Sequence, residues 1–292
     1  MSTQVTNAFV HQYDANFQHL SQQETARLRS AVRVKDGVKG TSTTFERIGT
    51  VSMQKRTSRH QDTHLVDTPH TRRRVFLDPY EVGDLIDDED EVRILIDPDS
   101  AYAQAFVYAG ARQLDDFVVT AMNGNATAVT ATESAETATT VALPSAQKVA
   151  AASTGLTLAK LRAATRILDG AEVPKGDRWI AYDALGLEDI LGDSTATSAD
   201  YNSVRLLMSA DIDTFHGFKW LHSERLPDNS GSDGSLFYAW HRRGVGLAFG
   251  FDIKTEMTIR TDKSNSLQVL TKLMAGAVRI EDAMVVEMDV LD

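Results

Sequence analysis

The chain has 292 residues, of which 42% are hydrophobic and 24% charged, values ordinary for a globular protein with one large core or two smaller ones. It contains no cysteine and carries a formal net charge of −11, which excludes disulfides and thiolate chemistry. No basic start followed by an apolar run marks a secretory signal, and no run approaches the roughly 18 apolar residues of a membrane span. We therefore expect a soluble protein made in a cytoplasm, with no membrane partner.

Residues 1–38 are predicted to form an extended N-terminal arm. Apolar residues recur near helical spacing at Phe9, Tyr13 and Phe17, but Gln and Ser are abundant between them. A short helix this polar is marginal on its own. Terminal segments of this type become ordered when they dock on a partner, so we expect the arm to need one.

Residues 39–78 predict a long, arginine-rich β-hairpin that has no core of its own. Val, Ile, Thr and Phe mark two strand-like runs between Gly40 and Phe76, and polar and basic residues fill the tip between them. An isolated two-stranded ribbon is at best marginally stable in water. We therefore predict that this ribbon lies on another subunit, which favours an assembly role over catalysis.

The charge is distributed unevenly along this part of the chain. From Arg27 to Arg74 there are 12 Lys and Arg against 4 Asp and Glu, and an acidic stretch follows from Glu81 to Glu91. One interpretation is two solvated faces, and another is a basic arm that meets the acidic stretch of a second copy. A nucleic-acid interface is a third, but a single-strand binder needs aromatic rings among its basic residues, and this arm has only Phe45 and Phe76.

The strongest helix is predicted over residues 97–123. Asp97 suits the N-cap and Pro98 the first helical position, and Asn123-Gly124 supplies the stop. An apolar stripe at helical period runs through Tyr102, Phe106, Ala109, Leu114, Phe117, Val118 and Ala121. At 1.5 Å per residue the helix would be a rod roughly 39 Å long, which suits a structural spine.

The second half of the chain mixes helices and strands. The Ala- and Thr-rich residues 125–155 indicate irregular or short-stranded structure, and a helix is predicted over 157–170. A strand at 179–182 and a short helix between Asp183 and Gly192 follow.

From Phe215 onward the pattern is mostly strand, broken by a loop at 228–235, and the chain ends in two strands parted by Glu281-Asp282. Without a regular βαβ alternation, the order of elements predicts an α+β fold.

No motif in the chain predicts an active site. Gly244, Gly246 and Gly250 are spaced G-x-G-x-x-x-G, and no βαβ unit surrounds them, so a tightly packed strand explains them better than a dinucleotide. His60, His64 and His70 lie in a predicted ribbon and loop, where solvated side chains fit better than metal ligands. His216, His222 and His241 are predicted to be buried or at strand edges. We therefore predict no enzymatic activity, no cofactor and no metal.

Taken in order, these elements resemble the major capsid proteins of tailed bacteriophages, which have the Hong Kong 97-type fold. The resemblance covers essentially the whole chain. The local patterns that carry it are patterns of packing, and they lie in LDGAEVPKGDRWIAYDALGLEDILGD at 168–193, FHGFKWLHSERLP at 215–227 and KLMAGAVRIEDAMVVEMDV at 272–290.

The resemblance implies a division of the chain into named parts. Residues 1–38 would be the N-terminal arm and 39–78 the extended loop that reaches over a neighbouring subunit. A peripheral domain would contain residues 79–124, with the spine helix, and the strands at 251–278. An axial domain would contain residues 125–250 and the final strand within 279–292.

The resemblance also implies the function and the partners. Copies of the chain would form hexamers and pentamers that close into an icosahedral shell around double-stranded DNA, bound without sequence specificity, with a portal at one vertex. No N-terminal scaffolding domain is recognisable, which implies a separate scaffold protein or a processed chain. The location would be the virion capsid, assembled in the host cytoplasm. Some relatives join subunits by a Lys-Asn isopeptide bond, but no partner matches Lys55, so no crosslink is predicted.

Our hypothesis for the contacts between subunits is electrostatic. Basic residues of the hairpin would engage a neighbour's acidic stretch, chiefly Arg72, Arg73 and Arg74. The candidate contact residues are Lys55, Arg56, Arg59, Arg72, Arg73, Arg74, Asp87, Asp88 and Glu91. Three alternatives stay open: a nanocompartment shell of the same fold around an enzyme cargo, a DNA-binding protein that uses the basic arm, and an enzyme or nucleotide-binding protein of another type.

Overall fold

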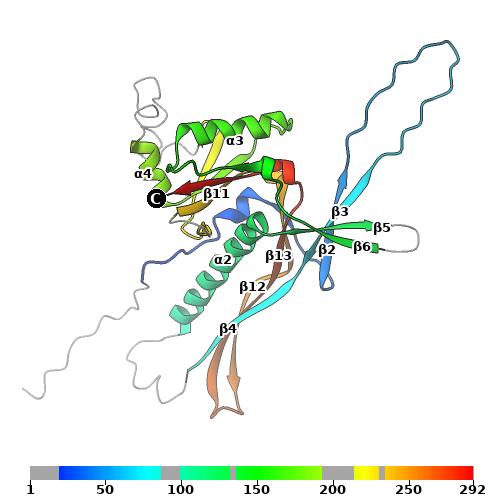
Figure 1. Cartoon of the computed structure of the whole chain (residues 1–292). Coiled ribbons are helices and arrows are strands. Elements are labelled where there is room, and N and C mark those ends of the chain that lie inside the picture. Colours follow the sequence, from blue (N-terminus) through cyan, green and yellow to red (C-terminus); the bar gives the residue numbers. More distant parts are fainter. Residues whose placement is uncertain (1–19, 87–98, 132–135, 193–213, 230–233, 292) are drawn as a thin grey trace, which may run out of the picture. The chain divides into compact units, whose positions relative to one another are not determined.

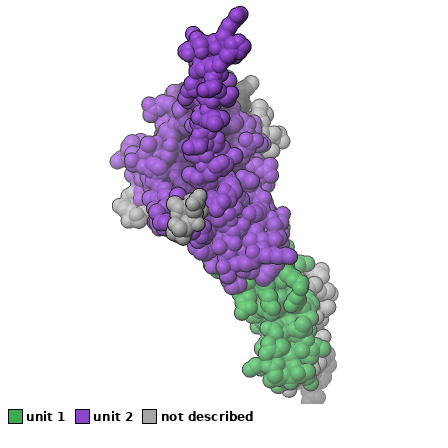
Figure 2. All heavy atoms as spheres, turned by 90° about the vertical axis from the view of Figure 1, so that its right-hand side faces the viewer, with its two compact units in different colours: residues 1–25, 80–112, 253–273 green, residues 26–79, 113–252, 274–292 purple. Residues whose placement is uncertain are grey.

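The computed structural model describes residues 20–86, 99–131, 136–192, 214–229 and 234–291 (Figure 1). Close contacts divide the chain into two compact units, which Figure 2 shows in different colours. Unit 1 contains residues 1–25, 80–112 and 253–273, and unit 2 contains residues 26–79, 113–252 and 274–292.

The architecture is α+β, as predicted. The helices are α2 (Asp99–Asn123), α3 (Leu158–Gly170) and α4 (Ala184–Gly192), with short 3-10 turns that include η2 (Leu28–Ala31), η4 (Arg242–Gly244) and η5 (Asp282–Met284). The strands are β1 (Arg33–Lys35), β2 (Ser42–Ile48), β3 (His70–Phe76), β4 (Asp78–Ile86), β5 (Ala126–Ala131), β6 (Glu136–Val141), β7 (Lys148–Val149), β8 (Arg178–Tyr182), β9 (Thr214–Phe215), β10 (Phe218–His222), β11 (Gly234–His241), β12 (Val245–Arg260), β13 (Ser266–Arg279) and β14 (Val285–Leu291).

The main core of unit 2 surrounds a six-stranded mixed sheet with the order β7-β14-β11-β8-β10-β9. Its central strand β11 pairs antiparallel with both β14 and β8. Phe237, Tyr238 and Trp240 on β11 are fully buried, because this strand is covered on both faces and is apolar at successive positions. The indole nitrogen of Trp240 donates to the carbonyl oxygen of Ala31 at 2.8 Å, which fixes η2 near this sheet.

Helices α3 and α4 complete this part of unit 2. Leu158, Leu161, Ala164 and Leu168 form the buried stripe of α3, and the ammonium group of Lys160 donates to the carbonyl oxygen of Asp289 on β14 at 2.9 Å. Asp183 caps α4 as predicted, because its Oδ1 accepts from the backbone N–H of Gly186 at 2.8 Å.

A second sheet in unit 2 joins the base of the hairpin to a later hairpin, in the order β2-β3-β5-β6. All of its neighbours are antiparallel, with Phe45 opposite Arg73 and Arg73 opposite Ala128. The predicted strand pair between Gly40 and Phe76 is confirmed. The Ala- and Thr-rich stretch, for which irregular or short-stranded structure was expected, contains the β5–β6 hairpin.

The third sheet has the order β1-β12-β13-β4. Within unit 1, Val269 and Leu273 of β13 are buried, and the hydroxyls of Thr255 and Thr271 lie 2.8 Å apart. Every residue of β4 except Ile86 is exposed. β4 covers the start of the acidic stretch, for which no strand was predicted.

The predicted spine helix is confirmed over Asp99–Asn123, and its 25 residues span roughly 37 Å. Leu114, Val118 and Met122 are buried at intervals of four residues, as an apolar stripe requires. The predicted cap at 97 and 98 lies outside the described residues, as do Phe9, Tyr13 and Phe17 of the N-terminal arm.

Close packing explains the three glycines that resemble a dinucleotide fingerprint. A Cβ atom would lie 2.7 Å from a Met284 atom at Gly244, 2.7 Å from a Phe45 ring atom at Gly246 and 2.9 Å from the Met274 sulfur at Gly250. Only glycine fits these positions, because neighbouring side chains occupy the space of a Cβ atom. This close packing is what the interpretation of a tightly packed strand predicted.

The closest backbone approach at a glycine is at Gly276 on β13, where a Cβ atom would lie 1.9 Å from the carbonyl oxygen of Phe76. Because a backbone atom of a packed strand cannot yield, we expect Gly276→Ala to lower the free energy of unfolding by roughly 1–3 kcal/mol. Urea denaturation followed by circular dichroism measures the change. Gly170→Ala is the matched control, because nothing lies within 4 Å of the added atom, and equal stability of the two variants would contradict the prediction.

Candidate assembly interface

The hairpin extends beyond its paired strands into a segment without a core. From Gly49 to Pro69 every residue is exposed except the half-buried Gln61. Apolar side chains are among them: Met53 and Leu65 are more than nine-tenths exposed, and Val51 is 58% exposed. Figure 1 shows this segment projecting as a long loop from β2 and β3. Large apolar side chains this exposed on a segment without a core suit a surface that another molecule covers.

Short-range hydrogen bonds organise the tip of this hairpin. The side-chain oxygen of Gln61 accepts from the backbone N–H of Thr57 at 2.9 Å and of Ser58 at 3.3 Å, and Arg56 Nε donates to the carbonyl oxygen of Ser58 at 2.9 Å. His60 turns the chain with a φ of 57°. These contacts give the tip local order but bury no apolar side chain.

Three of the predicted contact residues, Lys55, Arg56 and Arg59, lie at this tip and are exposed. Within the described part of the chain, none of the three forms an ion pair. Their charges are therefore available to another molecule.

The three consecutive arginines at the base of the hairpin lie on β3 and point to alternate faces of its sheet. Arg72 pairs with Glu46 at 2.9 Å and Arg74 with Glu136 at 2.6 Å, and these two pairs lie on the more exposed face. Arg73 points to the other face, where it is 3% exposed. The three residues therefore do not form a single basic patch.

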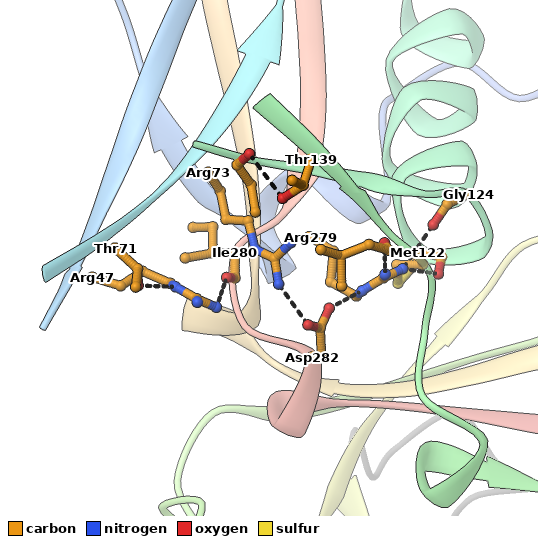
Figure 3. Close-up of polar contacts among 11 residues, drawn as sticks. Arg47, Thr71, Arg73, Met122, Gly124, Thr139, Arg279, Ile280 and Asp282 are labelled. Atoms are coloured by element: carbon orange, nitrogen blue, oxygen red, sulfur yellow. Dashed lines mark hydrogen bonds and ion pairs between the residues drawn. The ribbon is translucent and has the colours of Figure 1, made fainter. Parts of the chain in front are cut away.

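Arg73 belongs to a buried network around one carboxylate, shown in Figure 3. Its Nη2 donates to Asp282 Oδ2 at 2.6 Å, and Arg279 Nε donates to Asp282 Oδ1 at 2.5 Å. Arg47 lies beside them and donates to the carbonyl oxygen of Ile280 at 2.8 Å. Asp282 thus joins the base of the hairpin to the last turn of the chain.

Arg279 extends this network to two further elements. Its Nη1 donates to the carbonyl oxygens of Met122 at 3.1 Å and Gly124 at 2.8 Å, and its Nη2 donates to that of Val141 at 3.0 Å. The C-terminal carbonyls of a helix have no partner within the helix, so this side chain satisfies acceptors at the end of α2. Arg279 is 0% exposed, and every nitrogen of its guanidinium group has an acceptor.

The network has an excess of positive charge. Burial lowers the pKa of Arg73; Asp282 opposes this shift, and nearby Arg47 and Arg279 add to it. Among the described residues, Nε and Nη1 of Arg73 have no hydrogen-bond acceptor. The single carboxylate of Asp282 is therefore the anion on which the burial of both arginines depends.

The structure brings together only part of the predicted contact set. It places Arg72, Arg73 and Arg74 on one strand, and Lys55, Arg56 and Arg59 at the far end of the same hairpin, while Asp87, Asp88 and Glu91 lie outside the described residues. The contact of any of them with a second copy stays a prediction.

Sequence reasoning missed Arg47, Arg279 and Asp282. A signal was present for Arg279, because AVRI in AVRIEDA places a charged residue between apolar residues at the end of a strand. A charged residue on the buried face of a strand needs an ionic partner.

We expect Asp282→Asn to lower the free energy of unfolding by about 3–5 kcal/mol, because the loss of one partner leaves buried charges without compensation. Urea denaturation measures this change. The matched control is Glu46→Gln, which breaks the exposed pair with Arg72 and should cost less than about 1 kcal/mol. A loss at Asp282 no larger than that at Glu46 would show that the network contributes little.

Two other kinds of site find no support in the described ranges. No group of three or more His, Cys, Asp or Glu side chains there is placed to hold a metal ion. None of the described helices is both long enough and apolar enough to cross a bilayer.

Comparison with known structures supports the fold. The capsid protein of cyanophage P-SCSP1u has a TM-score of 0.76 at 17% identity, over 99% of this chain and 95% of that one. Mycobacterium phage Che8 has a TM-score of 0.71 at 17% identity, over 97% of both chains. The capsid of a native GTA particle has a TM-score of 0.73 at 10% identity, over 99% of this chain and 98% of that one.

Comparison by sequence identifies the family. No curated protein matches the chain, but the phage capsid protein family matches residues 5–292. The match covers nearly the whole chain, and the similar structures share its α+β architecture. The chain therefore belongs to the phage capsid protein family, has the Hong Kong 97-type fold, and is a structural protein that serves as a building block of a capsid.

Proposed function

We propose that copies of this chain assemble into hexamers and pentamers that close into an icosahedral shell around double-stranded DNA. The observation that carries the proposal is the hairpin extension, in which nearly every side chain from Gly49 to Pro69 is exposed, large apolar ones included. Such a segment buries no apolar side chain in one copy. A neighbouring copy can cover these side chains.

The charge distribution supports a second copy as the partner of the hairpin. Residues 27–74 hold 12 of the 30 Lys and Arg of the chain but only 4 of its 41 Asp and Glu. The rest of the chain is therefore strongly acidic, and a basic hairpin tip is complementary to it. We propose that Lys55, Arg56 and Arg59 engage an acidic surface of the neighbour, for which Asp87, Asp88 and Glu91 stay the candidates.

At the base of the hairpin, the three arginines differ in whether a neighbouring copy can reach them. Arg73 is held by Asp282 of its own chain, whereas Arg72 and Arg74 lie on the more exposed face of the sheet in pairs that are partly open to solvent. Exposed pairs of this type are worth about 0.2–1 kcal/mol and can exchange partners during assembly. Many such weak contacts allow wrong assemblies to dissociate, and multivalency stabilises the closed shell.

The remaining parts of the proposal follow from the family. We assign the spine helix and the 251–278 strands to a peripheral domain, and residues 125–250 with the last strand to an axial domain around the five- and six-fold axes. A portal and a separate scaffold protein are the proposed partners, with assembly in the host cytoplasm. The acidic chain would not grip the packaged DNA, which has to leave again.

A reversal of charge at the hairpin tip tests the contact with a neighbour. We expect the triple variant Lys55→Glu, Arg56→Glu, Arg59→Glu to remain a folded monomer and to form few shells, because like charges would then meet at the contact. Sedimentation velocity and circular dichroism measure the two properties. The same residues changed to Gln separate loss of attraction from repulsion, and normal shells from the Glu variant would refute this contact.

The shell itself is tested by negative-stain electron microscopy of the purified chain, with and without a scaffold protein. We expect closed shells or rings of five and six copies. Particles from infected cells should contain DNA protected from nuclease. An enzyme inside the particles instead of DNA would support the nanocompartment alternative, and a stable monomer under every condition would refute the shell.

A further inference from the structure

A polar chain outside the hairpin connects three segments of unit 2 through one histidine. Arg27 Nη1 lies 2.7 Å from His222 Nδ1 and 2.8 Å from the carbonyl oxygen of the same residue. On the other side of the ring, His222 Nε2 lies 2.6 Å from Glu224 Oε1. That carboxylate oxygen also accepts from the backbone N–H of Ala184 at 2.8 Å, at the start of α4.

The partners of the ring determine where its proton lies. A guanidinium group can only donate, so His222 Nδ1 has to accept from Arg27 and carries no proton. A carboxylate can only accept, so Nε2 donates to Glu224. The geometry therefore requires a neutral ring with its proton on Nε2. A second proton would fall on Nδ1, face a guanidinium nitrogen at 2.7 Å, and abolish that hydrogen bond.

The other groups around the ring do not replace this contact. Tyr182 of β8 packs edge-on against it, with ring centroids 5.6 Å apart, and the pKa of Tyr182 is raised by burial, so it stays uncharged. Asp116 of α2 is bound by Arg225 through two hydrogen bonds. Asp115 accepts from the backbone N–H groups of Arg27 and Leu28, each at 3.0 Å. Glu224 is then the anion that faces the ring, and it favours a protonated one.

Arg27 and Glu224 thus favour opposite protonation states of the His222 ring, because Arg27 needs a neutral Nδ1 as acceptor and Glu224 attracts a positive ring. The side chain of His222 is 38% exposed, so protons from solvent reach it. We infer that this ring is a pH-sensitive latch: in its neutral form Nδ1 accepts from Arg27, and in its protonated form the ring pairs with Glu224 and leaves Arg27 only the carbonyl oxygen of His222.

Arg27 is followed directly by η2, and Leu28 and Ala31 of this turn and Val32 after it are 0% exposed. The latch therefore acts at the point where the chain leaves its N-terminal segment and enters the core of unit 2. After the bond between Arg27 and the ring is lost, Asp115 still accepts from the backbone N–H groups of Arg27 and Leu28. Protonation would loosen this entry point without unfolding the core beyond it.

Hydrogen exchange followed by mass spectrometry tests the latch on the intact chain. For peptides that cover residues 26–31, we expect protection factors, corrected for intrinsic exchange, to fall by roughly fivefold or more between pH 8 and pH 5.5, as the loss of one hydrogen bond to a charged group predicts. Peptides from α3 should keep their protection. Unchanged protection at 26–31 would overturn the inference.

His222→Asn distinguishes the latch from a general effect of acid. Asparagine places an oxygen near the position of Nδ1 and does not titrate, so protection at 26–31 should become independent of pH. His70→Asn, which removes an exposed histidine of the hairpin, is the matched control and should keep the wild-type response. A pH response that persists in His222→Asn would overturn the inference, as would nitrogen NMR of the neutral ring that finds its proton on Nδ1.

Discussion

The carboxylate of Asp282 is the interaction on which the arrangement of unit 2 depends. It binds Arg73 from the hairpin base and Arg279 from the end of β13, and Arg279 then binds carbonyl oxygens at the end of α2 and on β6. The hairpin base, the end of α2 and β6, all more than 100 residues from this turn in sequence, thus meet beside it. Because both arginines are buried, their charges would have no compensating anion there without Asp282.

This network fixes the base of the hairpin in unit 2 and leaves its tip exposed for contact with a partner. Its base strand β3 pairs with β5, and Arg73 and Arg47 attach its inner face to the last turn of the chain. Beyond Ile48 and His70, the Gly49 N–H donates to the carbonyl oxygen of Pro69 at 2.9 Å, and short-range hydrogen bonds organise the tip. A hairpin with a fixed base and an exposed tip suits an assembly, because the base holds the tip in position for contact with another copy.

For the arginine triplet on β3, the sequence can predict the direction of each side chain but not the partner of the buried one. Arg72, Arg73 and Arg74 were expected to engage the acidic stretch of a neighbouring copy together. Period-2 alternation along a strand already requires the middle residue to point away from the other two, so this part was within reach of the sequence. The identity of its partner was not, because Asp282 lies more than 200 residues away.

The sequence by itself determined the elements whose signals are local. The spine helix, α3, the cap of α4, the hairpin strands and the tight packing at three glycines followed from periodicity, capping residues and composition, which act within a few residues. The tertiary structure alone decided which charges are buried and which stay free, how β4 joins its sheet, and that one histidine lies between Arg27 and Glu224. These features depend on contacts between distant segments, and such contacts leave no periodic trace in the chain because each partner is a single residue in a different element.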